Sequence, residues 1–353
     1  MGAIGMIRFK PGAPRRVPPR SRSTRLPTYA VPTALGATAV AYRATCPLAH
    51  DEALTARLIS SAVMCALVTG LVMHVRHRLL RDLRRARRTA EAAQSALLRP
   101  PPPEVDGLAA AAVHLSADPG ARIGGDLYEV VATEHGVRAV IGDVRGHGLG
   151  AVRTAAAVLG CFREAAHDEA DLAGVLRRLD RTMARHLRDR AQDGPPGEEF
   201  VTVLLLEILP DGVVRALNCG HPWPYLLTGG RAEPLARTEP LPPLGLFPLP
   251  ADLPAVLRGP LLPGDALVLH TDGAEEARDA EGRFFPLRDV LTAAARERPL
   301  TPRSVLCAVL TALLRHTAGP PNDDVALLIL RNERHLGITP AHPHAKPHLQ
   351  SPA

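Results

Sequence analysis

The larger, C-terminal part of the sequence predicts an α+β domain, because strand-like and helix-like segments occur there in groups. Runs of β-branched and other apolar residues, typical of strands, occupy residues 138–141, 201–209, 213–217, 266–270 and 325–330. Apolar residues at helical spacing occupy residues 151–166, 172–187 and 303–314. This order lacks the strict alternation of strand and helix that indicates a parallel α/β sheet.

The composition sets the size and class of the protein. A chain of 353 residues with 46% hydrophobic and 22% charged residues fits one substantial globular domain with additional segments. The five cysteines are scattered, and none forms a CxxC pair, so neither a disulfide framework nor a thiolate zinc site is predicted. We therefore expect a reducing compartment.

The net charge of +6 comes from two basic clusters near the N-terminus. Residues 1–27 contain seven Lys or Arg and no acidic residue, and residues 76–88 contain seven Arg and one Asp. No stacking aromatic residues accompany these clusters, so we expect no nucleic acid partner.

The basic clusters enclose a predicted transmembrane region at residues 26–75. Residues 58–73 have no charged side chain and precede an arginine cluster, which predicts a transmembrane helix at about 58–75 with a cytoplasmic flank. A buried core helix is the alternative. A weaker uncharged stretch, 26–42, would complete a transmembrane hairpin that keeps both basic flanks inside. We expect a multi-pass cell-membrane protein with a disordered N-terminus, residues 1–25, and a cytoplasmic catalytic domain.

Residues 76–103 are predicted to form a linker helix with a proline break. Its apolar seam, at spacings of four and three, consists of Leu79, Leu83, Ala86, Ala90, Ala93 and Leu97. The seam could pair two chains as a homodimer or could belong to a single amphipathic helix, and the sequence leaves both open. The four prolines at 100–103 end the helix.

Acidic residues recur in glycine-rich turns beside the strand-like runs. Asp126 lies in GGDLYEVV, Asp143 in AVIGDVRGHG and Asp272 in LVLHTDGAEEA, while Asp323 and Asp324 precede VALLIL. Each one alone is ordinary turn chemistry. As a set, carboxylates at strand ends beside close-approaching glycines are what a site for hard divalent cations requires, and Mg²⁺ or Mn²⁺ is the natural choice.

The motifs GGDLYE, GDVRGHG, NCGHPWPYLL, LHTDGAEEARDAEGRFF and DDVALLIL occur in the order found in one known family. Over residues 104–331 the sequence resembles the PPM-type, protein phosphatase 2C-like serine/threonine phosphatases, in the sporulation stage II protein E branch and its membrane-bound actinobacterial type. The resemblance implies two packed antiparallel β-sheets flanked by helices, an α/β/β/α sandwich, with metals at one edge between the sheets. It also implies that the helical pair after Asp143 moves when activity switches. Residues 332–353, after the region of resemblance, are expected to be a disordered tail.

The resemblance also implies a set of ligands for two metal ions, Mn²⁺ or Mg²⁺. Asp143 matches the aspartate that bridges both metals, and Val144 matches the position that contributes its backbone carbonyl. Asp126 matches the acidic residue that binds the second metal or its water.

The remaining implied ligands lie at the ends of the later strands. Asp272 and Asp323 match the carboxylates on one metal, with Asp324 as the second choice to Asp323. Two cations about 3.5–4 Å apart would activate a water for in-line attack on phosphorus, without a protein nucleophile. Asp143 and Asp272 are therefore the expected catalytic residues, and Arg122 could add a guanidinium contact to the phosphate.

Two other residue types have ordinary structural interpretations. His147, in the GHG turn, is expected to be structural rather than a general acid. Cys219 and His221 could suggest a nucleophile and its base, but no third orienting residue is close in sequence, so Cys219 is expected in the core.

The resulting prediction is a protein phosphatase that acts on phosphoserine or phosphothreonine, with an anti-sigma-factor antagonist as the expected phosphoprotein partner. Two alternatives stay open. One is a catalytically weak phosphoprotein-binding signalling module at the membrane, and the other is a hydrolase of small phosphate esters. Assays of a phosphopeptide against a nucleotide separate these functions.

Overall fold

The structure is a computed structural model, which describes residues 36–38, 41–42, 45, 54–115, 125–146, 148–193, 199–321 and 323–334. The chain divides into two compact units, Met1–Leu83 and Arg84–Ala353. The predicted N-terminal segment, residues 1–25, and most of the predicted tail lie outside the described residues.

Helix α2, Leu54–Leu97, is a single helix of 44 residues, whereas the sequence predicted a membrane helix and a separate linker helix. Its sequence contains no proline, so nothing interrupts the backbone hydrogen bonds before the proline run. Among the described residues, one stretch, Ala62–Asp82, is long and apolar enough to cross a membrane. Of the predicted first span, 26–42, only residues 36–38, 41 and 42 are described, as helical.

The second unit contains two antiparallel sheets, as predicted. The five-stranded sheet has the order β3-β4-β5-β6-β9. Its strands are β3 (Asp126–Thr133), β4 (Gly136–Val144), β5 (Val201–Ile208), β6 (Val214–Cys219) and β9 (Val256–Arg258). The six-stranded sheet has the order β1-β2-β11-β10-β7-β8. Its strands are β1 (Glu104–Val105), β2 (Leu108–Leu115), β11 (Val325–Asn332), β10 (Ala266–His270), β7 (Tyr225–Thr228) and β8 (Arg231–Pro234).

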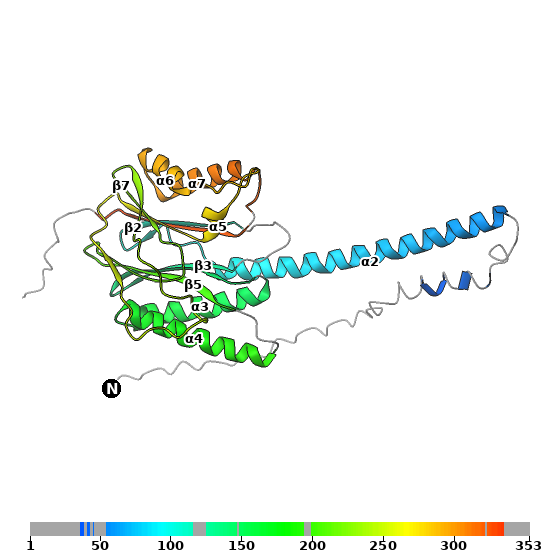
Figure 1. The fold of residues 1–353 in the computed structure, drawn as a ribbon, viewed down its shortest axis with the longest axis horizontal. Helices are drawn as coiled ribbons and strands as arrows, with labels where there is room; N and C mark the ends of the chain where they lie inside the picture. The colour runs from blue at the N-terminus through cyan, green and yellow to red at the C-terminus, as the bar shows by residue number, and fades with distance from the viewer. Residues whose placement is uncertain are drawn as a thin grey trace, which may run out of the picture. The chain divides into compact units, whose positions relative to one another are not determined.

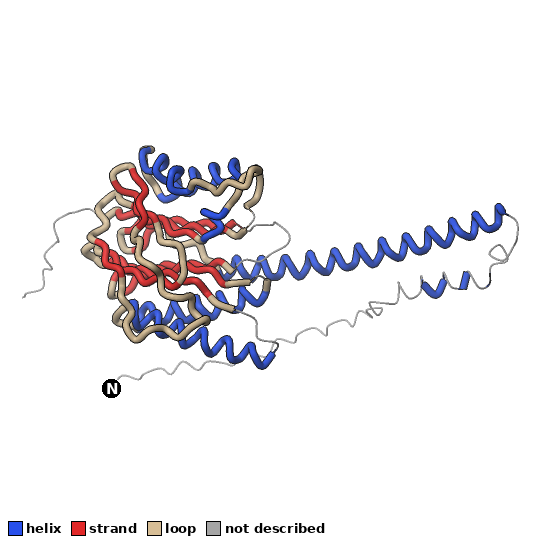
Figure 2. The backbone as a smooth tube through the Cα atoms, viewed as in Figure 1, coloured by secondary structure: helices blue, strands red, loops and turns tan. Residues whose placement is uncertain are grey.

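Helices cover the outer face of each sheet, which completes the predicted sandwich (Figures 1 and 2). Helices α3 (Leu149–Asp168) and α4 (Leu172–Asp193) lie on the five-stranded sheet. Helices α6 (Leu287–Arg296) and α7 (Pro302–His316) lie on the six-stranded sheet. A short helix, α5 (Asp272–Glu276), follows β10 directly.

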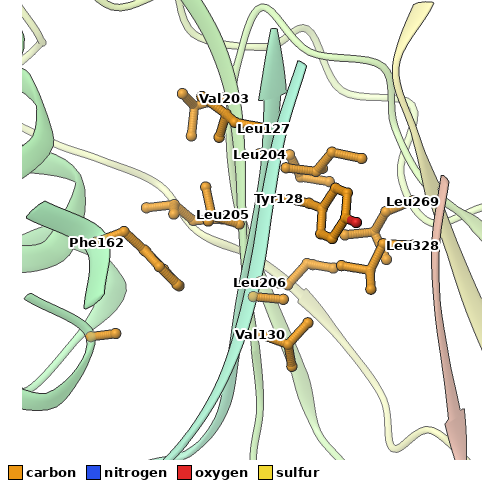
Figure 3. Close-up of a cluster of buried hydrophobic side chains, with 14 of the residues drawn as sticks. Leu127, Tyr128, Val130, Phe162, Val203, Leu204, Leu205, Leu206, Leu269 and Leu328 are labelled. Atoms are coloured by element: carbon orange, nitrogen blue, oxygen red, sulfur yellow. The ribbon is translucent and has the colours of Figure 1, made fainter. Parts of the chain in front are cut away.

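Side chains alternate along the central strands, so the five-stranded sheet contributes to two apolar layers. Figure 3 shows Leu205 of β5 pointing toward Phe162 of α3. Its neighbour Leu204 points the opposite way, toward Leu269 of the second sheet. Even-numbered positions of β5 therefore face the space between the sheets, which fixes the orientation of polar residues at the strand end.

A buried arginine fastens the C-terminal end of α3 to the sheet. Arg138 of β4 is fully buried, and its Nε and Nη2 donate to Glu207 Oε1 of β5 at 2.8 and 2.7 Å. Its Nη1 donates to the carbonyls of Ala166 and Glu169 at 2.9 and 2.6 Å. These are carbonyls that a helix end leaves without a partner inside the helix, so Arg138 acts as a C-terminal cap.

The contacts of the phosphatase-like unit extend beyond residues 104–331 at both ends. Leu98 is buried in the larger apolar core, and Arg163 donates to the Leu97 carbonyl at 3.1 Å. At the other end, Arg334 Nη2 donates to Asp106 Oδ2 at 2.7 Å. A shortened protein that is meant to fold as this unit should therefore include residues 97–334.

Candidate functional site

Two aspartates lie side by side at one end of the five-stranded sheet, where β3 begins and β4 ends. Asp126 begins β3, and it lies directly opposite Asp143 in the antiparallel register. Asp143 in turn lies opposite Thr202 of β5. Residues directly opposite each other have side chains on the same face, so the three form one row facing the second sheet.

The second sheet brings further carboxylates to the same edge. Asp272 is the second residue after β10, and Asp323 and Asp324 precede the first residue of β11. Because β10 and β11 pair antiparallel, with His270 opposite Leu327, the end of one strand lies beside the start of the other. The structure therefore brings the predicted residues from four strands to one edge between the sheets.

A threonine links the two groups of carboxylates. Thr271, between β10 and Asp272, donates its hydroxyl to Asp126 Oδ2 at 3.1 Å across the inter-sheet space. The same hydroxyl accepts from the backbone N–H of Ala326 at 2.9 Å. Asp126 is thus tied to the second sheet, and His114 Nε2 of β2 lies 3.9 Å from its Oδ2.

The carboxylates raise one another's pKa values. Burial, followed by repulsion from Asp143 and Asp324, raises the pKa of Asp126 well above its ordinary value. Burial together with the charges of Asp272, Asp323 and Asp324 raises the pKa of Asp143 to about 7. Partial desolvation and repulsion from Asp323 also raise the pKa of Asp272, although its side chain is exposed. The site has an excess of negative charge that a bound cation would offset.

The surroundings of Asp143 fit a cation whose ligands include a backbone carbonyl. A Cβ at Gly125 would collide with the Val144 carbonyl oxygen and would lie 2.8 Å from Asp143 Oδ1. Only glycine therefore lets this backbone approach the two predicted oxygen ligands. Among the described residues, no three acidic, histidine or cysteine side chains already converge tightly enough to hold a metal ion.

A second glycine has the same role on the other sheet. A Cβ at Gly273 would collide with the Asp324 carbonyl oxygen and would lie 3.5 Å from the Asp323 Cβ. The backbone after β10 and the backbone before β11 can approach only because residue 273 lacks a side chain. The donor set as a whole, carboxylates and a carbonyl, suits Mg²⁺ or Mn²⁺.

Three predicted residues have other outcomes. Arg122 and His147 lie outside the described residues, so their predicted roles stay predictions. Cys219 is fully buried, and burial raises the pKa of its thiol to about 12, so it is a core residue and not a nucleophile.

Sequence reasoning missed Thr202 and Thr271 as residues that hold the site together, and it considered His221 only as a possible base beside Cys219. Thr202, Thr271 and His221 make hydrogen bonds across strands and between the sheets. The sequence offered only their places within motifs as a signal: Thr271 directly precedes the aspartate of TDG, and His221 is the histidine of NCGH. Neither position reveals which distant strand supplies the partner.

Comparison with known proteins gives the family. The profile of the stage II sporulation protein E (SpoIIE) family matches residues 133–333, more than half of the chain. The RsbU and RsbW domains of a Mycobacterium tuberculosis protein are similar at 27% identity and a TM-score of 0.50, over 64% of this chain and 60% of that chain.

Two further solved structures share the fold. The SiaA-PP2C domain of Pseudomonas aeruginosa is 20% identical, with a TM-score of 0.56 over 73% of this chain and 98% of that chain. The PP2C phosphatase domain of SpoIIE from Bacillus subtilis, with a fragment of its regulatory domain, is 17% identical. Its TM-score is 0.50, over 64% of this chain and 62% of that chain. The chain thus spans about 60% of the length of the Mycobacterium and Bacillus chains.

These matches agree with the sheets and the helices described above. The chain belongs to the stage II sporulation protein E family, and it shares the fold of the PP2C phosphatase domain of SpoIIE from Bacillus subtilis.

Proposed function

We propose that this chain is a metal-dependent phosphatase that hydrolyses phosphoserine or phosphothreonine in a regulatory phosphoprotein. The observation that supports this most directly is the pair Asp126 and Asp143, directly opposite on neighbouring strands, with Asp126 buried, Asp143 half-buried and both pKa values raised. Like charges in that position destabilise a sheet. A site that retains them is suited to binding cations.

Five residues would hold two Mn²⁺ or Mg²⁺ ions. Asp143 would contact both, and Asp126 with the Val144 carbonyl would complete the side formed by the five-stranded sheet. Asp272 and Asp323 would bind from the six-stranded sheet. Asp323 is preferred to Asp324, whose backbone carbonyl lies against residue 273. When bound, the cations lower the pKa of a water molecule and neutralise charge on the phosphoryl oxygens.

The protein's own contribution is to hold these oxygens in place. Thr271 donates to Oδ2 of Asp126 and so restricts the orientation of that carboxyl group. Thr202 accepts from the backbone N–H of Asp143 at 3.3 Å and so supports the end of β4. Arg122 would add a guanidinium for the phosphate.

The substrate would be a regulatory phosphoprotein such as an anti-sigma-factor antagonist. The likeness to a Mycobacterium tuberculosis chain with RsbU and RsbW domains supports a regulatory protein partner. The apolar stretch Ala62–Asp82 supports attachment to the cell membrane, with the arginine cluster and the catalytic unit in the cytoplasm. A membrane hairpin and a homodimer formed through the linker helix complete the proposal.

The test is phosphate release from a phosphoserine protein by the full chain in mild detergent, with Mn²⁺ or with EDTA. We expect phosphate release with Mn²⁺ and none with EDTA. The rate of release should fall at least about a hundredfold in Asp143→Asn and in Asp272→Asn. Asp211→Asn is the matched control, because Asp211 is an exposed carboxylate in the turn after β5. It should retain wild-type activity.

Other outcomes favour the alternatives. Mn²⁺ binding without release from any phosphoprotein would indicate a phosphoprotein-binding module. Hydrolysis of a nucleotide but not of phosphoprotein would indicate a hydrolase of small phosphate esters.

A further inference from the structure

A buried imidazole connects the two sheets directly behind the acidic edge. His221, which follows β6, is 3% exposed. Its Nδ1 lies 3.0 Å from Thr202 Oγ1 in its own sheet, and its Nε2 lies 3.0 Å from the His270 carbonyl oxygen of β10 in the other sheet. Thr202 lies beside Asp143, and His270 is two residues before Asp272. The imidazole therefore joins the backbones that support these two carboxylates.

The hydrogen-bond directions along this connection follow from chemistry. A carbonyl oxygen can only accept, so Nε2 of His221 has the proton and Nδ1 has the free lone pair. The Thr202 hydroxyl must then donate to Nδ1, and its oxygen is left to accept from the N–H of Asp143 at 3.3 Å. One tautomer of His221 thus satisfies all the hydrogen bonds that run from Asp143 through Thr202 and His221 to His270.

Burial and the backbone keep His221 in this state. Desolvation, with repulsion from His270, lowers the pKa of His221 to about 3, so the ring is neutral at physiological pH. Asn218 Nδ2 donates to the His221 carbonyl, and the His221 N–H donates to Asn218 Oδ1, each at 2.8 Å. This reciprocal pair fixes the main chain at His221 and so limits where the ring can lie.

We propose that His221 is a positioning residue for the metal centre, which sets the spacing between Asp143 on one sheet and Asp272 on the other. The inference rests on the proposed function, in which these two carboxylates share a metal ion. His221 itself contacts neither ion nor substrate. The Thr271–Asp126 hydrogen bond also joins the two sheets beside the site, so loss of His221 would remove the hydrogen bond between the sheets on the Asp143 side and leave the one on the Asp126 side.

Two substitutions test the two ring nitrogens of His221 one at a time. The amide of His221→Asn can approximate Nδ1 but is too short to reach the His270 carbonyl. The amide of His221→Gln can approximate Nε2 and retain the bond between the sheets. Thr202→Val, nearly the same shape without the hydroxyl, removes the link to Asp143 and tests the same chain from its other end.

The measurement is Mn²⁺ affinity of the full chain by calorimetry, alongside the thermal unfolding midpoint in EDTA and phosphatase kinetics. We expect His221→Asn to weaken Mn²⁺ binding about tenfold or more, as loss of a partner that orients metal ligands does. His221→Gln should retain more affinity than His221→Asn. Activity should recover at high Mn²⁺ without a change in the KM for phosphoprotein. The matched control is His316→Asn, because His316 of α7 also hydrogen-bonds a backbone carbonyl, that of Arg283 at 3.0 Å, outside the sheets.

The possible results distinguish this inference from the proposed function. Wild-type Mn²⁺ affinity in folded His221→Asn and Thr202→Val, even with a lowered unfolding midpoint, would overturn the positioning role and leave the phosphatase intact. Weakened Mn²⁺ binding in a chain that releases no phosphate would support the positioning role and overturn the phosphatase. No Mn²⁺ binding by the wild-type chain would overturn both.

Discussion

Asp143 shows at the scale of one residue how a functional site opposes the stability of its own fold. Its pKa of about 7 in the folded chain exceeds its ordinary value of 3.8. The carboxyl therefore contributes stability that is fully present below about pH 4 and is lost as the pH rises to about 7. Above that pH, the ionised, half-buried carboxylate destabilises the metal-free protein.

We therefore predict that Asp143→Asn stabilises the metal-free chain at pH 8 by about 1–4 kcal/mol and has little effect at pH 4. The reason is that the amide removes the buried charge while it keeps the shape. Thermal unfolding in EDTA at both pH values is the measurement, with Asp211→Asn as the control. An equal change at both pH values would contradict the electrostatic explanation.

At this scale the sequence predicted the charged residues of the site better than the neutral ones. Asp126, Asp143 and Asp272 stand in glycine-rich motifs that are recognisable one by one. The roles of Thr202 and His221 depend on hydrogen bonds to strands distant in sequence. Such pairings are set by sheet register, which local patterns do not specify.

At the scale of secondary structure, the clearest predictions were strands rich in β-branched and apolar residues. The predicted strand at 266–270 coincides with β10, and the predicted 201–209 run gives β5 with one residue fewer. Strand β2, LAAAAVHL, was missed because alanine favours helix over strand and gives no alternating pattern. It forms a strand because it pairs with β11 over its whole length.

Arg138 connects three elements, so its loss should affect all of them. We predict that Arg138→Met lowers the free energy of unfolding by about 3–5 kcal/mol, because the buried Glu207 keeps only the partly exposed Arg215 as a partner and the carbonyls at the end of α3 lose their donor. The double variant Arg138→Met/Glu207→Leu should recover part of this loss, since no buried charge remains. Chemical denaturation with wild-type enzyme as reference is the measurement.

The control for this prediction is an arginine whose own side chain is exposed. Arg283 donates to Asp279 at 2.7 Å, its side chain is 73% exposed, and Arg283→Met should change the unfolding midpoint much less than Arg138→Met does. If the two arginine variants were equally destabilised, burial would not be the reason for the importance of Arg138.

At the scale of the whole molecule, the number of membrane crossings decides on which side the N-terminus lies. The predicted hairpin places residues 1–25 in the cytoplasm, whereas a single crossing by Ala62–Asp82 would place them outside. The rest of the predicted first span lies outside the described residues, so the orientation of the N-terminus is predicted from the charge of the sequence. The seven basic residues among residues 1–27 favour the inside.

We therefore predict that Ser23→Cys, in a Cys46→Ser background, is protected from a membrane-impermeant maleimide in intact cells. The native Cys46, in the predicted outer loop, should react in the parent chain. Labelling after permeabilisation confirms that residue 23 is reactive. Labelling of Ser23→Cys in intact cells would instead establish a single crossing.

The cap that Arg138 provides also determines how α3 could move. The helix of 20 residues is fastened at its C-terminal end, while its first residue, the exposed Leu149, lies six positions after Asp143. Such a helix is about 30 Å long, so a tilt of about 5° around the fastened end would displace Leu149 by about 2.6 Å. The buried Arg138 thus holds the end of α3 that is far from the acidic edge, and the end that would move is the one beside that edge. A small rotation of the helix pair would change the loop that follows Asp143 without disturbing the sheet that supports it.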